Sequence, residues 1–400
     1  MNKPTIIDHT VRYFRTQTAR LSVFIWCAAF AVSALLLCSS DASAYQVKRV
    51  MRGTTSMGSG DETITQDLGP AGANVLNGTN LNMERSLLLF NYQMNSSDAR
   101  VCYVMGMIDD ETTLSFNRKY SGTAAIINWT IIEFCEGVTV TSGVTIFADV
   151  NVNPQTKTIT IPAVPALNKA FVVVSNGGGT RSITTADESY RVAIRLVDTT
   201  HVQLQRGQGR DNGLANLEVY YQVVSFAADD ADVLVQHGDP DVLLNGVTSV
   251  GDGEVAASDT GTQVQVTIPT ALESMNDAFL YFTYWANNAV AGIEQRYAVD
   301  GDITSTSAMT FRRINNTNSV GIWWQVIQLR NPAMDGAGSV YYGQYAVRGR
   351  IVNSTVNTVV TTGLTGGVTL YSPRSFPLIS VSGGGAADAN SFDEVSYTGY

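Results

Sequence analysis

One short pattern of apolar and polar positions recurs along this chain at intervals of roughly a hundred residues. Residues 128–134 read NWTIIEF, residues 219–226 read VYYQVVSF and residues 322–329 read IWWQVIQL. Each segment alternates large apolar residues and carries further apolar residues between them, which is typical of a β-strand covered on both faces. The pattern therefore predicts one strand in three copies of a repeated unit.

Other recurring strands precede this one in each copy. The segments LSFNR, VQLQR and MTFRR end at Arg118, Arg206 and Arg313. Earlier come RVCYVMG, RVAIRLV and RYAVDGD, and before them SLLLF, AFVVV and AFLYF. Gly, Asn, Asp and Ser separate these runs, as expected for turns, and no stretch after residue 45 keeps a helical spacing. The chain is predicted to be all-β, built from tandem antiparallel β-sandwich repeats.

A V-x-x-G phrase marks the start of each copy. It ends at Gly53, Gly143 and Gly238, and a shorter version ends at Gly343. Residues 376–385 (FPLISVSGGG) then resemble residues 170–179 (AFVVVSNGGG), and the chain stops at residue 400 without another closing strand. We expect three complete repeats and one partial repeat, at residues 45–136, 137–228, 229–330 and 331–400.

The recurring residues are expected to be structural. Trp129, Tyr221 and Trp324 share one position in the closing strand and should fill each core. Burying such a side chain contributes about 1.5 to 3 kcal/mol of transfer free energy. The recurring Arg118, Arg206 and Arg313 should donate to strand-end carbonyls or to a local carboxylate rather than bind a ligand.

The N-terminus has the features of an export signal. Arg12, Arg15 and Arg20 precede an apolar run at residues 21–37, and the small residues at 42–44 suit a signal peptidase. Residues 1–44 are predicted to be a signal peptide, with an uncleaved anchor as the alternative. The protein is then extracellular or on the cell surface, with no stable membrane span after cleavage.

The charge of the chain bears on its partners, and its cysteines bear on a disulfide. The chain has 25 basic and 35 acidic side chains and no basic run, which argues against nucleic acid as a partner. After removal of the leader, Cys102 and Cys135 remain. An even pair in an exported chain predicts one disulfide, with two buried thiols as the alternative.

Catalytic and metal-binding motifs are scarce, so we predict no enzyme and no cofactor. His201 and His237 each occur in a single copy, and the glycine-rich stretches lack the Gly-Lys-Ser/Thr of a phosphate loop. One acidic segment is a weak Ca²⁺ candidate, the alternative being a hydrated linker. Its possible ligands are Asp229, Asp230, Asp232, Asp239 and Asp241.

The repeated closing strand, similar to W-x-V-V-E-F, resembles tandem repeats in uncharacterised exported bacterial surface or fibre proteins and in phage-like structural proteins. The resemblance covers most of residues 45–400. It implies a surface or fibre component and carries no site residues with it.

Two functions are therefore expected. In the first, the partial fourth repeat folds back on the third or docks on a neighbouring molecule, and the second arrangement forms a head-to-tail homopolymer. The candidate assembly residues are Phe376, Leu378, Ile379, Val381, Val47 and Val50. In the alternative, the protein is an adhesin or carbohydrate-binding module that stacks Tyr284 and Trp285 on a surface glycan.

Overall fold

The computed structural model describes residues 47–69, 80–94, 101–147, 155–179, 190–206, 216–238, 242–244, 263–286, 299–312 and 320–329. By its internal contacts the chain divides into residues 1–43 and 44–400, and every described residue belongs to the second part. The predicted leader and the predicted partial repeat at 331–400 lie outside the described residues, as does Arg313.

The described residues form an all-β structure, which confirms the predicted fold class. Three short 3-10 turns are described in full, η1 (Met83–Arg85), η3 (Leu167–Lys169) and η5 (Met275–Asp277), and no described residue is α-helical. Every strand pairing is antiparallel. None of the helices described here has the length and apolar character needed to cross a membrane.

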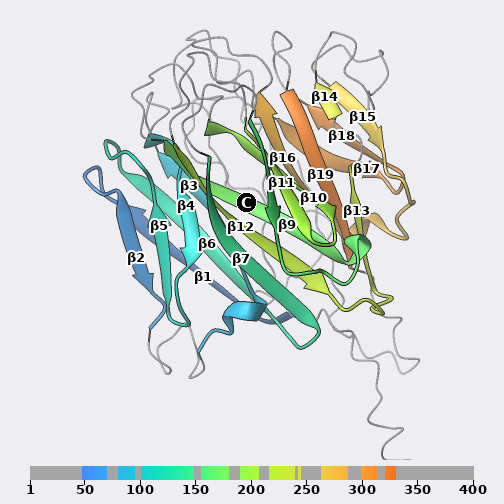
Figure 1. The fold of residues 1–400 in the computed structure, drawn as a ribbon, viewed down its shortest axis with the longest axis horizontal. Coiled ribbons are helices and arrows are strands. Elements are labelled where there is room, and N and C mark those ends of the chain that lie inside the picture. Colours follow the sequence, from blue (N-terminus) through green and yellow to red (C-terminus); the bar gives the residue numbers. More distant parts are fainter. Residues whose placement is uncertain are drawn as a thin grey trace, which may run out of the picture. The chain divides into compact units, whose positions relative to one another are not determined.

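One sheet order occurs three times (Figure 1). In the first sandwich it is β1-β6-β3, in the second β7-β12-β9, and in the third β19 lies between β16 and the pair β13 and β14. The bounds are β1 (Val47–Met57), β3 (Ser86–Met94), β6 (Ala125–Phe134), β7 (Val138–Phe147), β9 (Ala170–Gly179), β12 (Leu217–Phe226), β13 (Val233–His237), β14 (Val242–Leu244), β16 (Ala278–Ala286) and β19 (Val320–Leu329). The recurring closing strand is thus the central strand of each sheet.

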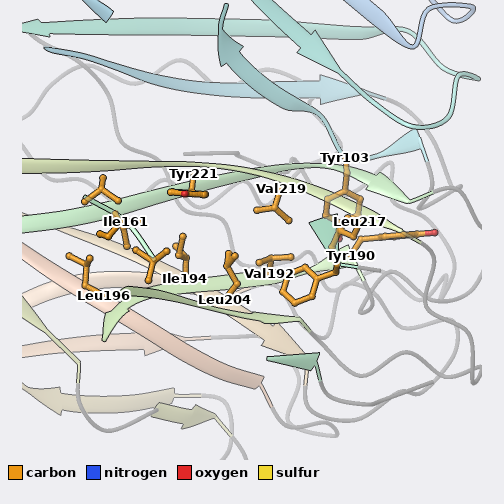
Figure 2. Close-up of a cluster of buried hydrophobic side chains, with 14 of the residues drawn as sticks. Tyr103, Ile161, Tyr190, Val192, Ile194, Leu196, Leu204, Leu217, Val219 and Tyr221 are labelled. Carbon is orange, nitrogen blue, oxygen red and sulfur yellow. The ribbon is translucent and has the colours of Figure 1, made fainter. Parts of the chain in front are cut away.

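A second three-stranded sheet faces the first in each sandwich. Its order is β2-β5-β4, then β8-β11-β10, then β15-β18-β17. The bounds are β2 (Thr63–Asp67), β4 (Met105–Ile108), β5 (Thr113–Asn117), β8 (Gln155–Thr160), β10 (Val192–Asp198), β11 (His201–Arg206), β15 (Gln263–Thr267), β17 (Asp300–Ser305) and β18 (Ala308–Arg312). Figure 2 shows the second core, where Val219 and Tyr221 of β12 meet Ile194 and Leu204 from the other sheet.

The recurring glycine and the recurring aromatic residue are cross-strand partners. Gly53 lies opposite Trp129, and Gly143 lies opposite Tyr221. A Cβ atom at Gly53 would come within 2.2 Å of the Trp129 ring, and one at Gly143 within 2.5 Å of the Tyr221 hydroxyl oxygen. The ring therefore lies over the glycine backbone, where no larger residue fits. Gly238 and Trp324 repeat this pair, at 2.3 Å.

The recurring arginines are buried at the ends of the second sheets. Arg118 is 2% exposed and donates to the carbonyl oxygens of Asp61 at 2.8 Å, Gly58 at 2.7 Å and Thr123. Arg206 is fully buried at the equivalent position. The guanidinium of Arg118 thus joins the strand end to neighbouring turns, because one rigid fork can satisfy several carbonyl groups at once.

Candidate functional site

The central sheets of the three sandwiches share a second apolar core. Phe134 of the first sandwich lies 6.3 Å from Phe226 of the second, and Phe171 of the second lies 6.1 Å from Phe279 of the third, measured between ring centroids. Along each central sheet, one face packs in the core of its own sandwich. The opposite face, which carries these phenylalanines, packs against the neighbouring sandwiches. Both faces of the central strands are therefore covered, as the sequence pattern predicts.

A buried glutamine links the second sandwich to the first. The amide nitrogen of Leu88 donates to Gln222 Oε1 at 3.0 Å, and Gln222 Nε2 donates to the carbonyl oxygen of Ser86 at 3.1 Å. Gln222 is 2% exposed and lies on the central strand β12. Its side chain thus pairs with the backbone of β3, the edge strand of the preceding sheet, as another strand would.

The third sandwich is linked to the second by an equivalent glutamine. The amide nitrogen of Val172 donates to Gln325 Oε1 at 2.8 Å, and Gln325 Nε2 donates to the carbonyl oxygen of Val172 at 2.7 Å. The two N–H donor positions match: Leu88 lies opposite Ile131, and Val172 lies opposite Val223, and these two partners share one position in the closing strand. Equivalent N–H groups therefore donate to a glutamine in both joints. The carbonyl that accepts from the glutamine Nε2 differs, being that of Ser86 in the first joint and that of Val172 in the second.

A hydroxyl group makes a second recurring contact. The amide nitrogen of Gly106 on β4 donates to Ser175 Oγ on β9 at 3.4 Å. The amide nitrogen of Ile194 on β10 donates to Thr283 Oγ1 on β16 at 2.9 Å, and the same hydroxyl donates back to the carbonyl oxygen of Ile194 at 3.4 Å. The first and second sandwiches thus each offer two backbone edges, and the sandwich that follows binds both with polar side chains.

The 3-10 turns add polar contacts at the other end of each joint. Arg85 of η1 lies 3.8 Å from the carboxylate of Glu136. Lys169, the corresponding last residue of η3, donates from Nζ to the carbonyl oxygens of Asp230 and, at 2.5 Å, Val233. His237 Nε2 lies 2.9 Å from the carbonyl oxygen of Leu167 and donates to it. These contacts fix how each turn meets the next sandwich.

Burial shifts two titratable groups at the second joint. Desolvation lowers the pKa of His237 below its ordinary value, because the positive form loses its hydration. The hydroxyl of Tyr281 accepts a hydrogen bond from the amide nitrogen of Val174 at 3.0 Å. Burial raises the pKa of Tyr281 well above its ordinary range. Both side chains are therefore neutral parts of the joint near pH 7.

The aromatic residues expected to bind a glycan are part of this joint instead. Trp285 is 6% exposed and packs with Ala193 and Trp323, with 5.1 Å between the two indole ring centroids. Arg195 stacks on Trp323 at 4.5 Å from the ring centroid. The prediction of an exposed stacking surface at Trp285 is wrong, because the ring buries its area against the second sandwich.

Tyr284 also makes contacts with the second sandwich. Its hydroxyl accepts a hydrogen bond from Arg191 Nη1 at 2.5 Å, and the guanidinium of Arg191 lies 5.1 Å from its ring centroid. The aromatic pair singled out as unique to one copy thus serves the joint between two copies.

The structure keeps Cys102 and Cys135 as separate thiols, so the predicted disulfide is not formed. Cys102 is 1% exposed and packs in the core of the second sandwich beside Tyr103. Cys135 directly follows β6 and is partly exposed. The alternative of two buried thiols holds for Cys102 only.

The acidic segment is described in part. Asp230 is 8% exposed and its Oδ1 accepts a hydrogen bond from the amide nitrogen of Asp232 at 3.0 Å. Burial raises the pKa of Asp230, which opposes the charge that a Ca²⁺ ligand needs. No group of three or more metal-ligating side chains is found within the described ranges. Asp239 and Asp241 lie outside those ranges.

The candidate assembly residues fall in two places. Val47 and Val50 lie on β1, which pairs along its length with β6, and both are partly buried against the shared apolar core. The first sandwich therefore uses this strand in its own sheet. Phe376, Leu378, Ile379 and Val381 lie outside the described residues.

No protein-family model matches the chain, and no curated protein matches it. Gln222 and Gln325, which join the sandwiches, are not among the functional residues predicted from the sequence. A signal was present, because both follow the recurring aromatic residue directly, in YQVV and WQVI.

Proposed function

We propose that this chain is an exported structural protein, a subunit of an extracellular filament, sheath or surface fibre. The observation that carries the proposal is the recurrence of one polar contact between successive sandwiches, Gln222 on Leu88 and Gln325 on Val172. Residues that could have formed a ligand site, such as Trp285, instead stabilise these joints. A chain whose buried polar groups hold its own units together is suited to bearing load.

The contact is directional. The preceding sandwich supplies the backbone of an edge strand, and the following sandwich supplies the side chain of a central strand. Two different surfaces therefore meet at each joint, so the contact is heterologous. Copies that meet end to end through unlike surfaces grow head-to-tail and do not close, which leads to a filament.

Charge supports the same function. The chain has a formal net charge of −10, which keeps an exported protein soluble until a specific contact forms. Apolar and backbone contacts drive assembly in this account. Added salt should therefore screen the repulsion between acidic copies and favour filaments.

Negative-stain microscopy tests the proposal. The purified chain is imaged beside a version that ends at residue 363, at equal concentration and at low and high salt. The expected result is filaments from the full chain, more of them at high salt, and single particles from the shorter version. Single particles from both versions under all conditions would refute the filament and leave a monomeric surface protein.

A further inference from the structure

The third sandwich presents the same two backbone edges that the first and second sandwiches use in their joints. Leu280 on β16 lies opposite Val326, as Val172 lies opposite Val223. Gly301 on β17 lies opposite Phe311, as Gly106 lies opposite Phe116. The third sandwich therefore has a complete equivalent of the surface that Gln222 and Ser175 bind on the first.

Burial distinguishes this surface from its equivalents. Leu88 is 3% exposed and Val172 is fully buried, each in the core of its own sandwich, whereas Leu280 is only partly buried. Gly106 and Ile194 are buried as well, whereas Gly301 is partly exposed. We call Phe279, Leu280 and Gly301 the distal edge, where Leu280 and Gly301 are less buried than their counterparts on the other two edges.

The sequence of residues 375–382 matches the strand that covers this edge elsewhere. With Phe376 aligned on Phe171, Ser380 takes the position of Ser175 and Thr283, whose hydroxyls bind the preceding sandwich. In the same alignment Leu378 takes the position of Val173, which belongs to the shared apolar core. The segment thus carries both the polar and the apolar groups that the distal edge requires.

The first sandwich of a second copy is less suited to the same edge. Asn91 stands at the position of Ser175 and Thr283, and Thr130 stands where Gln222 and Gln325 stand. A threonine is too short to make the paired contact of a glutamine. The segment also follows the third sandwich in the same chain, which gives it an effective concentration on the order of millimolar.

We propose that residues 375–382 of the same chain dock on the distal edge, with the Ser380 hydroxyl accepting the Gly301 N–H. The contact continues the series of joints and does not depend on polymerisation, since a monomer makes it as well. It has one consequence for filaments. Pro377 falls on the position of Leu88 and Val172 and has no N–H to offer a glutamine, so a joint between copies lacks this bond and is weaker than the joints within a chain.

A disulfide trap tests the docking. A Cβ atom at Gly177 lies 3.6 Å from the Cβ of Met105 across the first joint, within the range that a disulfide spans. The equivalent positions at the distal edge are Asp300 and Ser382. The test variant is therefore Asp300→Cys with Ser382→Cys, and the control is Met105→Cys with Gly177→Cys, both in a full chain whose native cysteines are replaced by alanine.

Non-reducing electrophoresis and mass measurement give the outcome. The expected result is a cross-linked monomer for both pairs, and a much lower yield when Gly383→Cys replaces Ser382→Cys, because the neighbouring side chain faces the other way. Cross-linked dimers or ladders would show that a second copy supplies the segment and would overturn the proposal. No cross-link at the distal edge, with the control pair cross-linked, would overturn it too.

Hydrogen exchange on the unmodified chain tests the docking without any substitution, so its result does not depend on a variant that folds. The amide of Gly301 should exchange as slowly as those of Gly106 and Ile194, within about tenfold, since all three are bound by a hydroxyl. Exchange at Gly301 more than about a hundredfold faster would refute the docking. Failure of filaments to form leaves both of these results unchanged, so the two proposals are tested separately.

Discussion

The two joints between sandwiches share their glutamine and hydroxyl contacts and differ in the side chains at their margins. Between the first and second sandwiches, the ion pair of Lys119 with Glu218 at 2.5 Å accompanies the glutamine contact. Between the second and third, the corresponding space holds Trp285 and Trp323 and the cation–π contact of Arg195. One joint is thus more polar at its margin and the other is more aromatic.

The difference shows which features a joint needs. Side chains at the margin vary between an ion pair and stacked rings, whereas a glutamine and a hydroxyl bind equivalent backbone N–H groups in both joints. Polar groups buried at an apolar contact permit one register, since any slip leaves them unsatisfied. The apolar core supplies affinity, and the glutamine and hydroxyl fix the alignment.

Removing the glutamine should have the largest effect. Gln325→Ala leaves the N–H and C=O groups of Val172 buried without partners. Each such group costs about 1 to 3 kcal/mol, so we expect the free energy of unfolding to fall by about 2 to 6 kcal/mol in urea denaturation. Gln222→Ala should act in the same way on the first joint.

Gln328 provides the matched control on the same strand. It is fully buried, and neither Oε1 nor Nε2 has a hydrogen-bond partner within the described part of the chain. Gln328→Leu should therefore leave stability unchanged or raise it by about 1 kcal/mol. If Gln325→Ala costs no more than Gln328→Leu, the glutamine contact does not fix the joint.

A change inside the second sandwich should destabilise its own core rather than a joint. Gly143→Ala forces a methyl group towards the Tyr221 hydroxyl oxygen, 2.5 Å from the new Cβ. Overpacking of this kind costs about 1 to 3 kcal/mol. Gly60→Ala is the control, because a Cβ there meets no atom within 4 Å. Equal melting temperatures for the two variants would contradict the ring-over-glycine packing.

Removing the hydroxyl contact should cost more stability at the second joint than at the first. Thr283→Val keeps the side-chain volume but leaves the Ile194 N–H without its acceptor at 2.9 Å, at a cost of about 1 to 2 kcal/mol. Ser175→Ala should cost less than about 1 kcal/mol, because its contact is longer, at 3.4 Å. The reverse order in denaturant titrations would break the ranking.

Acidification should weaken the second joint by the smallest amount. Burial lowers the pKa of His237, so between that pKa and about 6.5 the unfolded chain binds a proton that the folded chain does not. Stability is present above this window and is lost as the pH falls through it. His237→Gln keeps a donor for the Leu167 carbonyl and should flatten the pH dependence of unfolding between pH 7 and 5. An unchanged slope would exclude His237 as its cause.

Much of the fold could be predicted from the sequence. The closing strands carry a pattern that needs no tertiary information, and they are the central strands β6, β12 and β19. The pairing of Gly53 with Trp129 was harder to predict from the sequence. Both residues belong to recurring phrases, but their contact depends on a pairing register across more than 70 residues that no local pattern encodes.

The joints could not be predicted in the same way. Gln222 reads as a polar residue in an apolar strand, and only the packing of one sheet edge on another sheet face gives it a partner. Trp285 was interpreted as a ligand site because it is unique to one copy. A residue can also be unique to one repeat because the two joints carry different side chains at their margins. Gly177 at the first joint and Trp285 at the second occupy equivalent positions and differ in this way.

Amide hydrogen exchange of Leu88 and Val172 in three proteins tests the central claim most directly. Each amide is bound by one glutamine, so Gln222→Ala should speed exchange at Leu88 and leave Val172 slow, and Gln325→Ala should do the opposite. The account predicts this reciprocal pattern against the unmodified chain. Slow exchange at both amides in both variants would contradict the claim that one glutamine contact, used twice, joins the sandwiches.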